Sequence, residues 1–133
     1  LHVENVATIL KRRGKANVVD SMQIVGSVAG KRCVIVDDII DTPRTLCKAA
    51  ELLKDNGATD VIACATHGVF SDCAMDRLNE SCLSAVYVSD SIPQEHNKDR
   101  CDRLHELSIA PLLARAIRRI HDEKSLSVLF PHT

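Results

Sequence analysis

The hydrophobic positions of this chain follow two periods that alternate along it. Short β-branched runs at residues 33–36 and 61–65 have the length and composition of buried strands. The stretches after them carry apolar residues every three or four positions, as helices do when they bury one face. Alternation of strands with helices is typical of a parallel sheet with crossover helices, so the pattern predicts an α/β fold.

Further strands are predicted on both sides of these runs, at residues 6–10, 22–28, 85–88 and 104–107. A charged loop is expected at 11–17 and a polar loop or excursion at 90–103. The run at 33–36 is expected to be buried on both faces, because it contains no polar position.

Three helices are predicted. The first ends at Asn56-Gly57, because glycine accepts the left-handed conformation that terminates a helix. Ser71-Asp72 is expected to cap a short helix that runs to Leu78. Ser108 precedes a long final helix, with Pro111 tolerated in its first turn, and this helix is expected to pack on the sheet. The buried face of the first helix is predicted to comprise Leu46, Ala49, Ala50 and Leu53.

Composition and charge narrow the class of protein. The 133 residues are 45% hydrophobic and 26% charged, which fits one globular domain. A formal net charge of −1 provides no general attraction for nucleic acid or anionic membranes, and no apolar run approaches the roughly 18 residues of a membrane-spanning helix. No signal peptide is evident. The six cysteines form no C-x-x-C pair, so we expect reduced thiols and a cytoplasmic location.

Candidate chemistry is concentrated in the stretch C-V-I-V-D-D-I-I-D-T-P-R-T-L, which begins at residue 33. Asp37, Asp38 and Asp41 follow a predicted strand, and open α/β sheets bind ligands at the carboxyl ends of their strands. Carboxylates there can accept hydrogen bonds from sugar hydroxyls, or Asp37 and Asp38 can hold a hard cation. Alternatively, acids at this position serve only to cap the following helix.

The residues after these carboxylates offer donors for an anion. Thr42, Arg44 and Thr45 lie just before a helical pattern, and the free N–H groups of a helix N-terminus attract phosphate. One turn thus combines carboxylates that can accept hydrogen bonds from hydroxyls with donors that can bind a phosphate. This combination predicts a phosphorylated sugar as ligand.

The run V-D-D-I-I-D-T-x-x-T-L resembles the phosphoribosyl pyrophosphate motif of the type I phosphoribosyltransferase fold, in the form found in the ribose-phosphate pyrophosphokinase family. The resemblance covers nearly the whole chain, but only the second of the two similar domains that this family builds. The same family is matched by K-R-R at 11–13, A-T-H-G at 65–68, S-I-P at 91–93, A-I-R-R-I-H at 116–121 and S-L-S-V-L-F at 125–130.

The resemblance implies a transferase of the kinase type. Such enzymes pass the pyrophosphoryl group of ATP, with Mg²⁺, to the C1 hydroxyl of ribose 5-phosphate and make phosphoribosyl pyrophosphate for nucleotide biosynthesis. The resemblance implies catalytic roles for Lys11 and Arg13, in a loop that closes over ATP. Without the resemblance, this basic cluster would be interpreted as a solvated loop. Asp37 and Asp38 are implied to hold the ribose hydroxyls.

The residues from Asp41 to Thr45 are implied to surround the 5-phosphate, with Asp41 also accepting loop N–H groups. Here the chain departs from the family, because D-T-x-G-T is replaced by Asp41-Thr42-Pro43-Arg44-Thr45. Glycine suits a loop that approaches phosphate with φ > 0, and Arg44 would be strained there. An arginine could instead bind the phosphate itself. Both alternatives remain open.

Regulation and assembly are also implied. Ser125, Ser127 and Phe130 resemble a C-terminal segment that binds regulatory phosphate or ADP. Alternatively, they form only a frayed terminal turn. His67-Gly68 resembles a turn at subunit contacts, where a structural histidine is the simpler alternative. We expect self-association, since the family is hexameric, and no partner among nucleic acids or membranes.

The resemblance leaves three functional hypotheses. The chain is the C-terminal domain of a ribose-phosphate pyrophosphokinase, inactive alone because the N-terminal ATP-binding domain is absent. Alternatively, it is a non-catalytic synthetase-associated regulatory subunit that binds phosphoribosyl or nucleotide phosphates, which the altered loop would suit. An ordinary phosphoribosyltransferase acting on a base is disfavoured, because the tail from Ile109 to Phe130 matches the synthetases.

Overall fold

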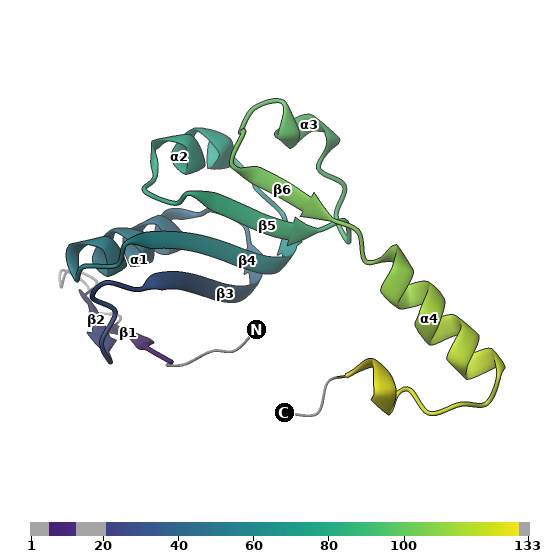
Figure 1. Cartoon of the computed structure of the whole chain (residues 1–133). Helices are drawn as coiled ribbons and strands as arrows, with labels where there is room; N and C mark the ends of the chain where they lie inside the picture. The colour runs from purple at the N-terminus through teal and green to yellow at the C-terminus, as the bar shows by residue number, and fades with distance from the viewer. Residues whose placement is uncertain (1–5, 13–20, 131–133) are drawn as a thin grey trace.

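The computed structural model describes residues 6–12 and 21–130 and contains two sheets, four α-helices and a 3₁₀ turn in that part of the chain (Figure 1). The elements, in chain order, are β1 (Thr8–Arg12), β2 (Ser21–Val25), β3 (Arg32–Ile40), α1 (Arg44–Asp55), β4 (Asp60–Gly68), α2 (Ala74–Glu80), β5 (Ala85–Ser89), α3 (Glu95–Lys98), β6 (Leu104–Leu107), α4 (Ala110–His121) and η1 (Ser127–Leu129).

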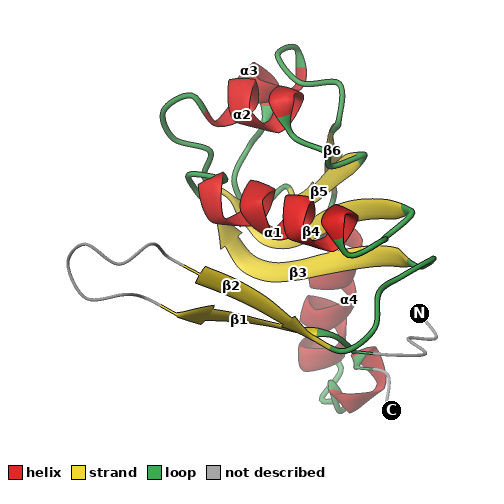
Figure 2. Cartoon of the chain, turned by 90° about the vertical axis from the view of Figure 1, so that its left-hand side faces the viewer, coloured by secondary structure: helices red, strands yellow, loops and turns green. Residues whose placement is uncertain are grey.

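The main sheet is parallel and has the strand order β3-β4-β5-β6. The register places Val34 opposite Ile62, and Val86 opposite Leu104. Each crossover steps to the next strand in the same direction, and right-handed crossovers then bring successive helices to one face. Figure 2 shows α1 and α2 on the same side of this sheet. The predicted α/β class is confirmed, with helices covering one face.

The core lies between this face and the helices. Leu46, Ala49, Ala50 and Leu53 of α1 are all buried, as the helical period predicts. Leu46, Ala50 and Leu53 belong to one cluster that also contains Val61 and Ala63 of β4, Val86 and Val88 of β5, and Met75 and Leu78 of α2. Asn56 and Gly57 end α1, and Gly57 adopts a φ of 88°, so the predicted stop is confirmed.

The other face of β3 is uncovered. Val34 is 46% exposed and Val36 is 77% exposed, so the expectation of a fully buried strand at 33–36 is wrong. The physical reason is position: β3 is the edge of the sheet, and the described part of the chain places no helix over these two side chains. A run of apolar residues does not reveal whether a second layer is present.

The strands before residue 26 form a hairpin outside the main sheet. β1 pairs antiparallel with β2, with Thr8 opposite Val25 and Lys11 opposite Met22. Lys11 and Arg12 therefore continue the strand that was predicted to end at residue 10. Ile9 and Ile24 pack against the core. The sequence pattern predicted these strands but not their antiparallel pairing.

Helix α4 forms where it was predicted, but the expected packing on the sheet is wrong. It has no buried residue, and Figure 1 shows it projecting away from the four-stranded sheet. Only Ser108 and Ile109 separate β6 from α4. The η1 segment folds back beside α4 instead.

Smaller differences concern the loops. Helix α2 begins after Cys73 with no side-chain cap, so the predicted capping by Ser71-Asp72 is wrong. The polar stretch at 90–103 contains the short helix α3, whereas the edge strand at 104–107 is confirmed. Within the described residues, no helix is long and apolar enough to cross a bilayer.

Candidate functional site

The candidate site begins inside β3, before the strand ends. Asp37 is paired with Ala65 of β4, and β3 continues to Ile40, so Asp37 and Asp38 belong to the strand instead of following it. The Asp37 carboxylate accepts a hydrogen bond from the Asp38 amide at 2.9 Å. Because β3 is an edge strand and both side chains are exposed, the two carboxylates remain open to a ligand.

Asp41 is engaged with the loop that follows β4. Its Oδ1 atom accepts hydrogen bonds from the amide of Ser71 at 3.2 Å and from the Ser71 hydroxyl. The carbonyl of Ile40 accepts two more, from the amides of Val69 at 2.9 Å and Phe70 at 3.2 Å. Ser71, expected to cap α2, thus holds the end of β3 in place. Asp41 was expected to accept N–H groups of its own loop, whereas the N–H that it accepts belongs to Ser71, 30 residues away.

The loop from Thr42 to Thr45 is unstrained. Arg44 is the first residue of α1 and does not have a positive φ, so the expected backbone strain at Arg44 is wrong. Pro43 occupies the N-cap position with a φ of −74° and a fully buried side chain. The Arg44 amide donates to the carbonyl of Thr42 at 2.8 Å. The departure from the family motif is therefore accommodated by starting the helix one residue after a packed proline.

This start changes the donors available to an anion. Pro43 has no N–H, and the N–H of Arg44 is already used within the turn. The side chains of Thr42, Arg44 and Thr45 are exposed at the same turn. The guanidinium of Arg44 is thus the cationic group that this turn would offer to an anion.

The carboxyl ends of β4 and β5 carry a network that sequence reasoning missed. Gln94, only 1% exposed, donates from Nε2 to the carbonyls of Gly68 at 2.7 Å and Ile92 at 2.9 Å. Ser89 and Ser91 donate to the carbonyl of Thr66 at 2.7 and 3.1 Å. These contacts fix the edge of the sheet beside the loop that binds Asp41. Nothing in the sequence indicated that Gln94, the polar residue that follows S-I-P, would be buried.

His67 and Gly68 lie in this network. Nδ1 of His67 is 2.8 Å from the Ser91 hydroxyl, which gives the histidine a structural partner. A Cβ on Gly68 would lie 2.4 Å from the ring of Phe70, so this position requires glycine. The subunit contact predicted for this turn stays a prediction.

The basic loop is only partly described. The backbone of Lys11 is in β1, while its side chain and the whole of Arg13 lie outside the described residues. The catalytic roles of Lys11 and Arg13 stay predictions.

The predicted regulatory residues are mutually bonded and exposed. The Ser125 and Ser127 hydroxyls lie 2.7 Å apart, and the Ser127 amide donates to the Ser125 hydroxyl at 3.2 Å. Phe130 is 65% exposed. The segment forms the 3₁₀ turn η1. Their regulatory role stays a prediction.

The cysteines are not paired with one another. All six cysteines are free thiols, as expected. Burial raises the pKa of Cys33, Cys47 and Cys64 above the usual thiol value, which favours the protonated thiol. No cluster of three His, Cys, Asp or Glu side chains with metal-binding geometry occurs in the described part of the chain.

Comparison with known proteins decides the family. Residues 3–131 match the family described as phosphoribosyl synthetase-associated domain. The chain belongs to that family. A ribose-phosphate pyrophosphokinase from Neisseria meningitidis is 49% identical over 126 residues, which are 95% of this chain and 38% of the relative. One from Caldanaerobacter subterraneus is 50% identical, covering 94% of this chain and 39% of the relative.

A solved structure agrees with these matches. The crystal structure of phosphoribosylpyrophosphate synthetase from Mycobacterium smegmatis aligns with a TM-score of 0.71 and 46% sequence identity, over 77% of this chain and 34% of that protein. The similarity to ribose-phosphate pyrophosphokinases and the phosphoribosyltransferase-like fold are therefore both confirmed. This phosphoribosyl synthetase-associated domain spans about two fifths of the length of the curated relatives that it matches.

Proposed function

We propose that this chain is the ribose 5-phosphate-binding domain of a ribose-phosphate pyrophosphokinase, a transferase that makes phosphoribosyl pyrophosphate from ATP and ribose 5-phosphate. The observation that carries the proposal is the motif D-D-I-I-D-T-P-R-T, which runs along an exposed sheet edge and into the start of α1. Relatives that share almost half of its residues bear the name of that enzyme.

Each part of the motif has a task in this proposal. Asp37 and Asp38 accept hydrogen bonds from the ribose hydroxyls, since ionised carboxylates are acceptors only. Thr42, Arg44 and Thr45 bind the 5-phosphate, with Arg44 replacing backbone donors by a guanidinium. Asp41, bonded to Ser71, keeps the turn in place. Lys11 and Arg13 neutralise the charge that develops on the transferred group.

The carboxylates also fit Mg²⁺ as the companion of ATP. Mg²⁺ is usually bound through one or two carboxylates together with substrate phosphates. Asp37 and Asp38 are adjacent, exposed oxygen ligands of this kind. The cation would neutralise phosphate charge, while the protein side chains orient the sugar.

A binding experiment tests the proposal on the chain itself. Calorimetric titration with ribose 5-phosphate is expected to show saturable binding that is lost in Asp37→Asn/Asp38→Asn. The double variant Asp99→Asn/Asp102→Asn changes the same charge at exposed sites elsewhere and is expected to bind normally. Absence of binding by the unaltered chain, or equal loss in both double variants, would contradict the proposed site.

The non-catalytic regulatory subunit is a second candidate, favoured by the reduced number of backbone donors at Pro43 and Arg44. The two candidates differ in the whole protein. If a full-length protein that contains this chain turns over, Lys11→Ala or Arg13→Ala is expected to lower kcat far more than it raises KM, because these cations act mainly in the transition state. Sugar phosphate binding without turnover would support the regulatory subunit.

We propose further that the chain self-associates in the cytoplasm and that ADP or phosphate regulates it near Ser125, Ser127 and Phe130. Support for self-association comes from the apolar side chains left exposed on β3 and α4, such as Val36 and Ile117. Light scattering should give a mass above the 14.6 kDa of one chain. A single-chain mass across a wide concentration range would rule this out.

A further inference from the structure

Two residues in the turn after β4 have a left-handed backbone although neither is glycine. Phe70 has a φ of 51° and Asp72 a φ of 56°, and Ser71 lies between them. This conformation is unfavourable for any residue that carries a Cβ atom. Such strain persists only where the surroundings hold it, and it is concentrated at functional sites. The strain in residues 69–72, named here the strained turn, thus points to a function.

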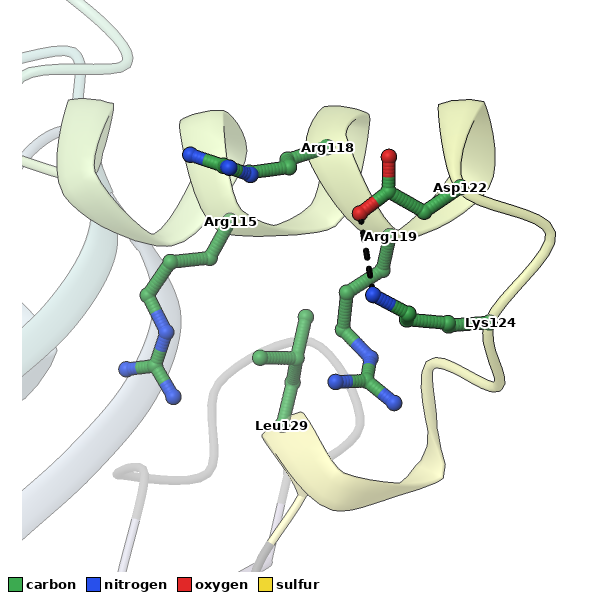
Figure 3. A pocket seen from close by; sticks show the side chains of 6 residues that line it. All are labelled: Arg115, Arg118, Arg119, Asp122, Lys124 and Leu129. Atoms are coloured by element: carbon green, nitrogen blue, oxygen red, sulfur yellow. Dashed lines mark hydrogen bonds and ion pairs between the residues drawn. The ribbon is translucent and has the colours of Figure 1, made fainter.

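The ordinary reason for a left-handed residue does not apply to the strained turn. Glu123, the third such non-glycine residue in the described part of the chain, follows α4, and a left-handed residue commonly ends a helix. Its neighbours Asp122 and Lys124 bond each other at 3.1 Å beside that helix end (Figure 3). The strained turn instead follows a strand and precedes α2, whose N-cap is Cys73. Ending or capping a helix therefore does not account for its conformation.

Packing explains the position of Phe70. Its side chain is buried, and a Cβ on Gly68 would lie 2.4 Å from its ring. The amide of Phe70 donates to the carbonyl of Ile40 at 3.2 Å, and the buried side chain of Gln94 donates to the carbonyl of Gly68 at 2.7 Å. These contacts hold the first half of the strained turn against the core and the end of β3.

Packing does not explain Asp72. This residue is exposed, and its carboxylate forms no hydrogen bond or ion pair with any residue that the structure describes. The contact that the turn does make belongs to Ser71, which donates its amide, at 3.2 Å, and its hydroxyl to Oδ1 of Asp41. The left-handed residues on either side of Ser71 thus direct both of its donors to one oxygen, which fixes the Asp41 carboxylate.

Asp41 is placed to pass this restraint to the proposed phosphate-binding residues. It directly follows β3, and α1 begins three residues later at Arg44. Pro43, the residue before α1, is fully buried. The segment is therefore held at one end by the bond between Asp41 and Ser71 and at the other by the packed proline. A backbone that is fixed before the ligand arrives lowers the entropy cost of binding.

We propose that Ser71 is a positioning residue for the sugar phosphate site: through Asp41, the strained turn fixes the segment 41–45 that receives the 5-phosphate. Ser71 does not touch the ligand. The inference rests on the proposed ribose 5-phosphate site, to which it adds a residue 30 positions away from Asp41. The strain at Phe70 and Asp72 is maintained because it preorganises the binding segment.

Calorimetric titration with ribose 5-phosphate tests the effect on binding. Ser71→Ala is expected to weaken binding about tenfold, because one charge-assisted hydrogen bond to Asp41 is lost. Ser71→Thr keeps the hydroxyl and is expected to restore the affinity. Ser84→Ala is the matched control and should leave binding unchanged. It removes a hydroxyl that bonds the Val61 carbonyl at 3.2 Å and the Asp60 carboxylate, at the opposite ends of the strands.

Amide exchange in the ligand-free chain tests the positioning role without the sugar phosphate. The Arg44 amide donates to the carbonyl of Thr42 at 2.8 Å, within the segment that Asp41 restrains. Its protection should be lost in Ser71→Ala, because the segment opens more often when Asp41 is released. Protection should be unchanged in Ser71→Thr and in Ser84→Ala.

The two measurements separate this inference from the proposed function. If the unaltered chain fails to bind ribose 5-phosphate, the proposed sugar site is wrong, and amide exchange alone decides whether Ser71 fixes the segment. Unchanged protection of the Arg44 amide in Ser71→Ala would overturn the inference, as would unchanged affinity of that variant when the unaltered chain binds. An equal loss in Ser84→Ala, or no rescue by Ser71→Thr, would show a general effect on folding and would overturn it as well.

Discussion

Helices α1 and α4 make an informative pair because they are alike as sequences and different in the fold. Each has 12 residues, a one-sided apolar stripe and at least one basic residue in its last turn. Helix α1 buries four residues against the sheet, whereas α4 buries none and leaves Ile117 67% exposed. The comparison shows that an apolar stripe predicts a helix with one hydrophobic face. It does not predict which part of the molecule covers that face.

The largest expected difference between the two helices is in the free energy of unfolding. Leu53→Ala in α1 should lower it by about 2–5 kcal/mol, because a fully packed leucine is replaced by a cavity. The matched change Leu113→Ala in α4 should cost less than about 0.5 kcal/mol, since this side chain is half exposed. Urea denaturation followed by circular dichroism measures both.

Protein concentration sharpens this pair of measurements. The proposed self-association would bury the α4 stripe, so the cost of Leu113→Ala should rise with concentration while that of Leu53→Ala stays constant. A large cost for Leu113→Ala even at high dilution would mean that α4 is packed within a single chain, contrary to the structure.

The C-terminal ends of the two helices provide the next comparison. Gly57 follows α1 with a φ of 88°, and an added Cβ would come within 3.3 Å of Ala29. Gly57→Ala should therefore destabilise the fold by about 1–2 kcal/mol, the usual cost of a left-handed conformation in a residue with a side chain. Thermal unfolding measures the change. An unaltered midpoint would show that α1 can end without this conformation.

Glu123 occupies the corresponding place after α4, with a φ of 53°. Glu123→Gly should stabilise the end of α4 by about 0.5–1 kcal/mol, because relief of the left-handed strain exceeds the entropy cost of glycine. Slower amide exchange in the last turn of α4 is the expected readout. Faster exchange there would show that the Glu123 side chain contributes more than its backbone conformation costs.

The smallest effect concerns pH at the start of α4. Asp90 accepts a hydrogen bond from the Ile109 amide at 2.9 Å, and this bond, with a further one from Ser108, lowers the pKa of the Asp90 carboxyl. Because the pKa of Asp90 is lower in the folded state, its ionised carboxylate stabilises the fold at pH values above the ordinary pKa near 3.8. This stabilisation is lost as the pH falls through the lowered pKa of the folded state. Acid should therefore loosen the junction between β6 and α4.

Amide exchange at Ile109, corrected for the intrinsic rate, checks this pH dependence. Protection should fall below about pH 4 in the unaltered chain and should already be low at pH 7 in Asp90→Ala, which lacks the acceptor. The start of α1 is the control, because the Arg44 amide donates to the carbonyl of Thr42, which does not titrate in this range. Equal loss of protection at both helix starts would point to general acid unfolding.

The sequence by itself determined the local elements and the chemistry of the motif. Periodicity predicted the buried face of α1 and the existence of α4, and turn chemistry predicted the end of α1 at Gly57. The carboxylates at 37, 38 and 41, beside the hydroxyls at 42 and 45, indicated a sugar phosphate before any coordinates. The predictions of the helices and of the α1 end are confirmed because they depend on residues a few positions apart, whereas the sugar phosphate stays a prediction.

Only the tertiary structure decided how distant segments meet. It showed that β1 and β2 pair as a hairpin outside the sheet, that β3 is an edge with one face open, and that α4 buries no residue against the described part of the chain. It also paired Asp41 with Ser71, 30 residues away, and gathered the arginines of α4 against Leu129. Such contacts depend on chain direction and link length, which hydrophobic periodicity does not encode.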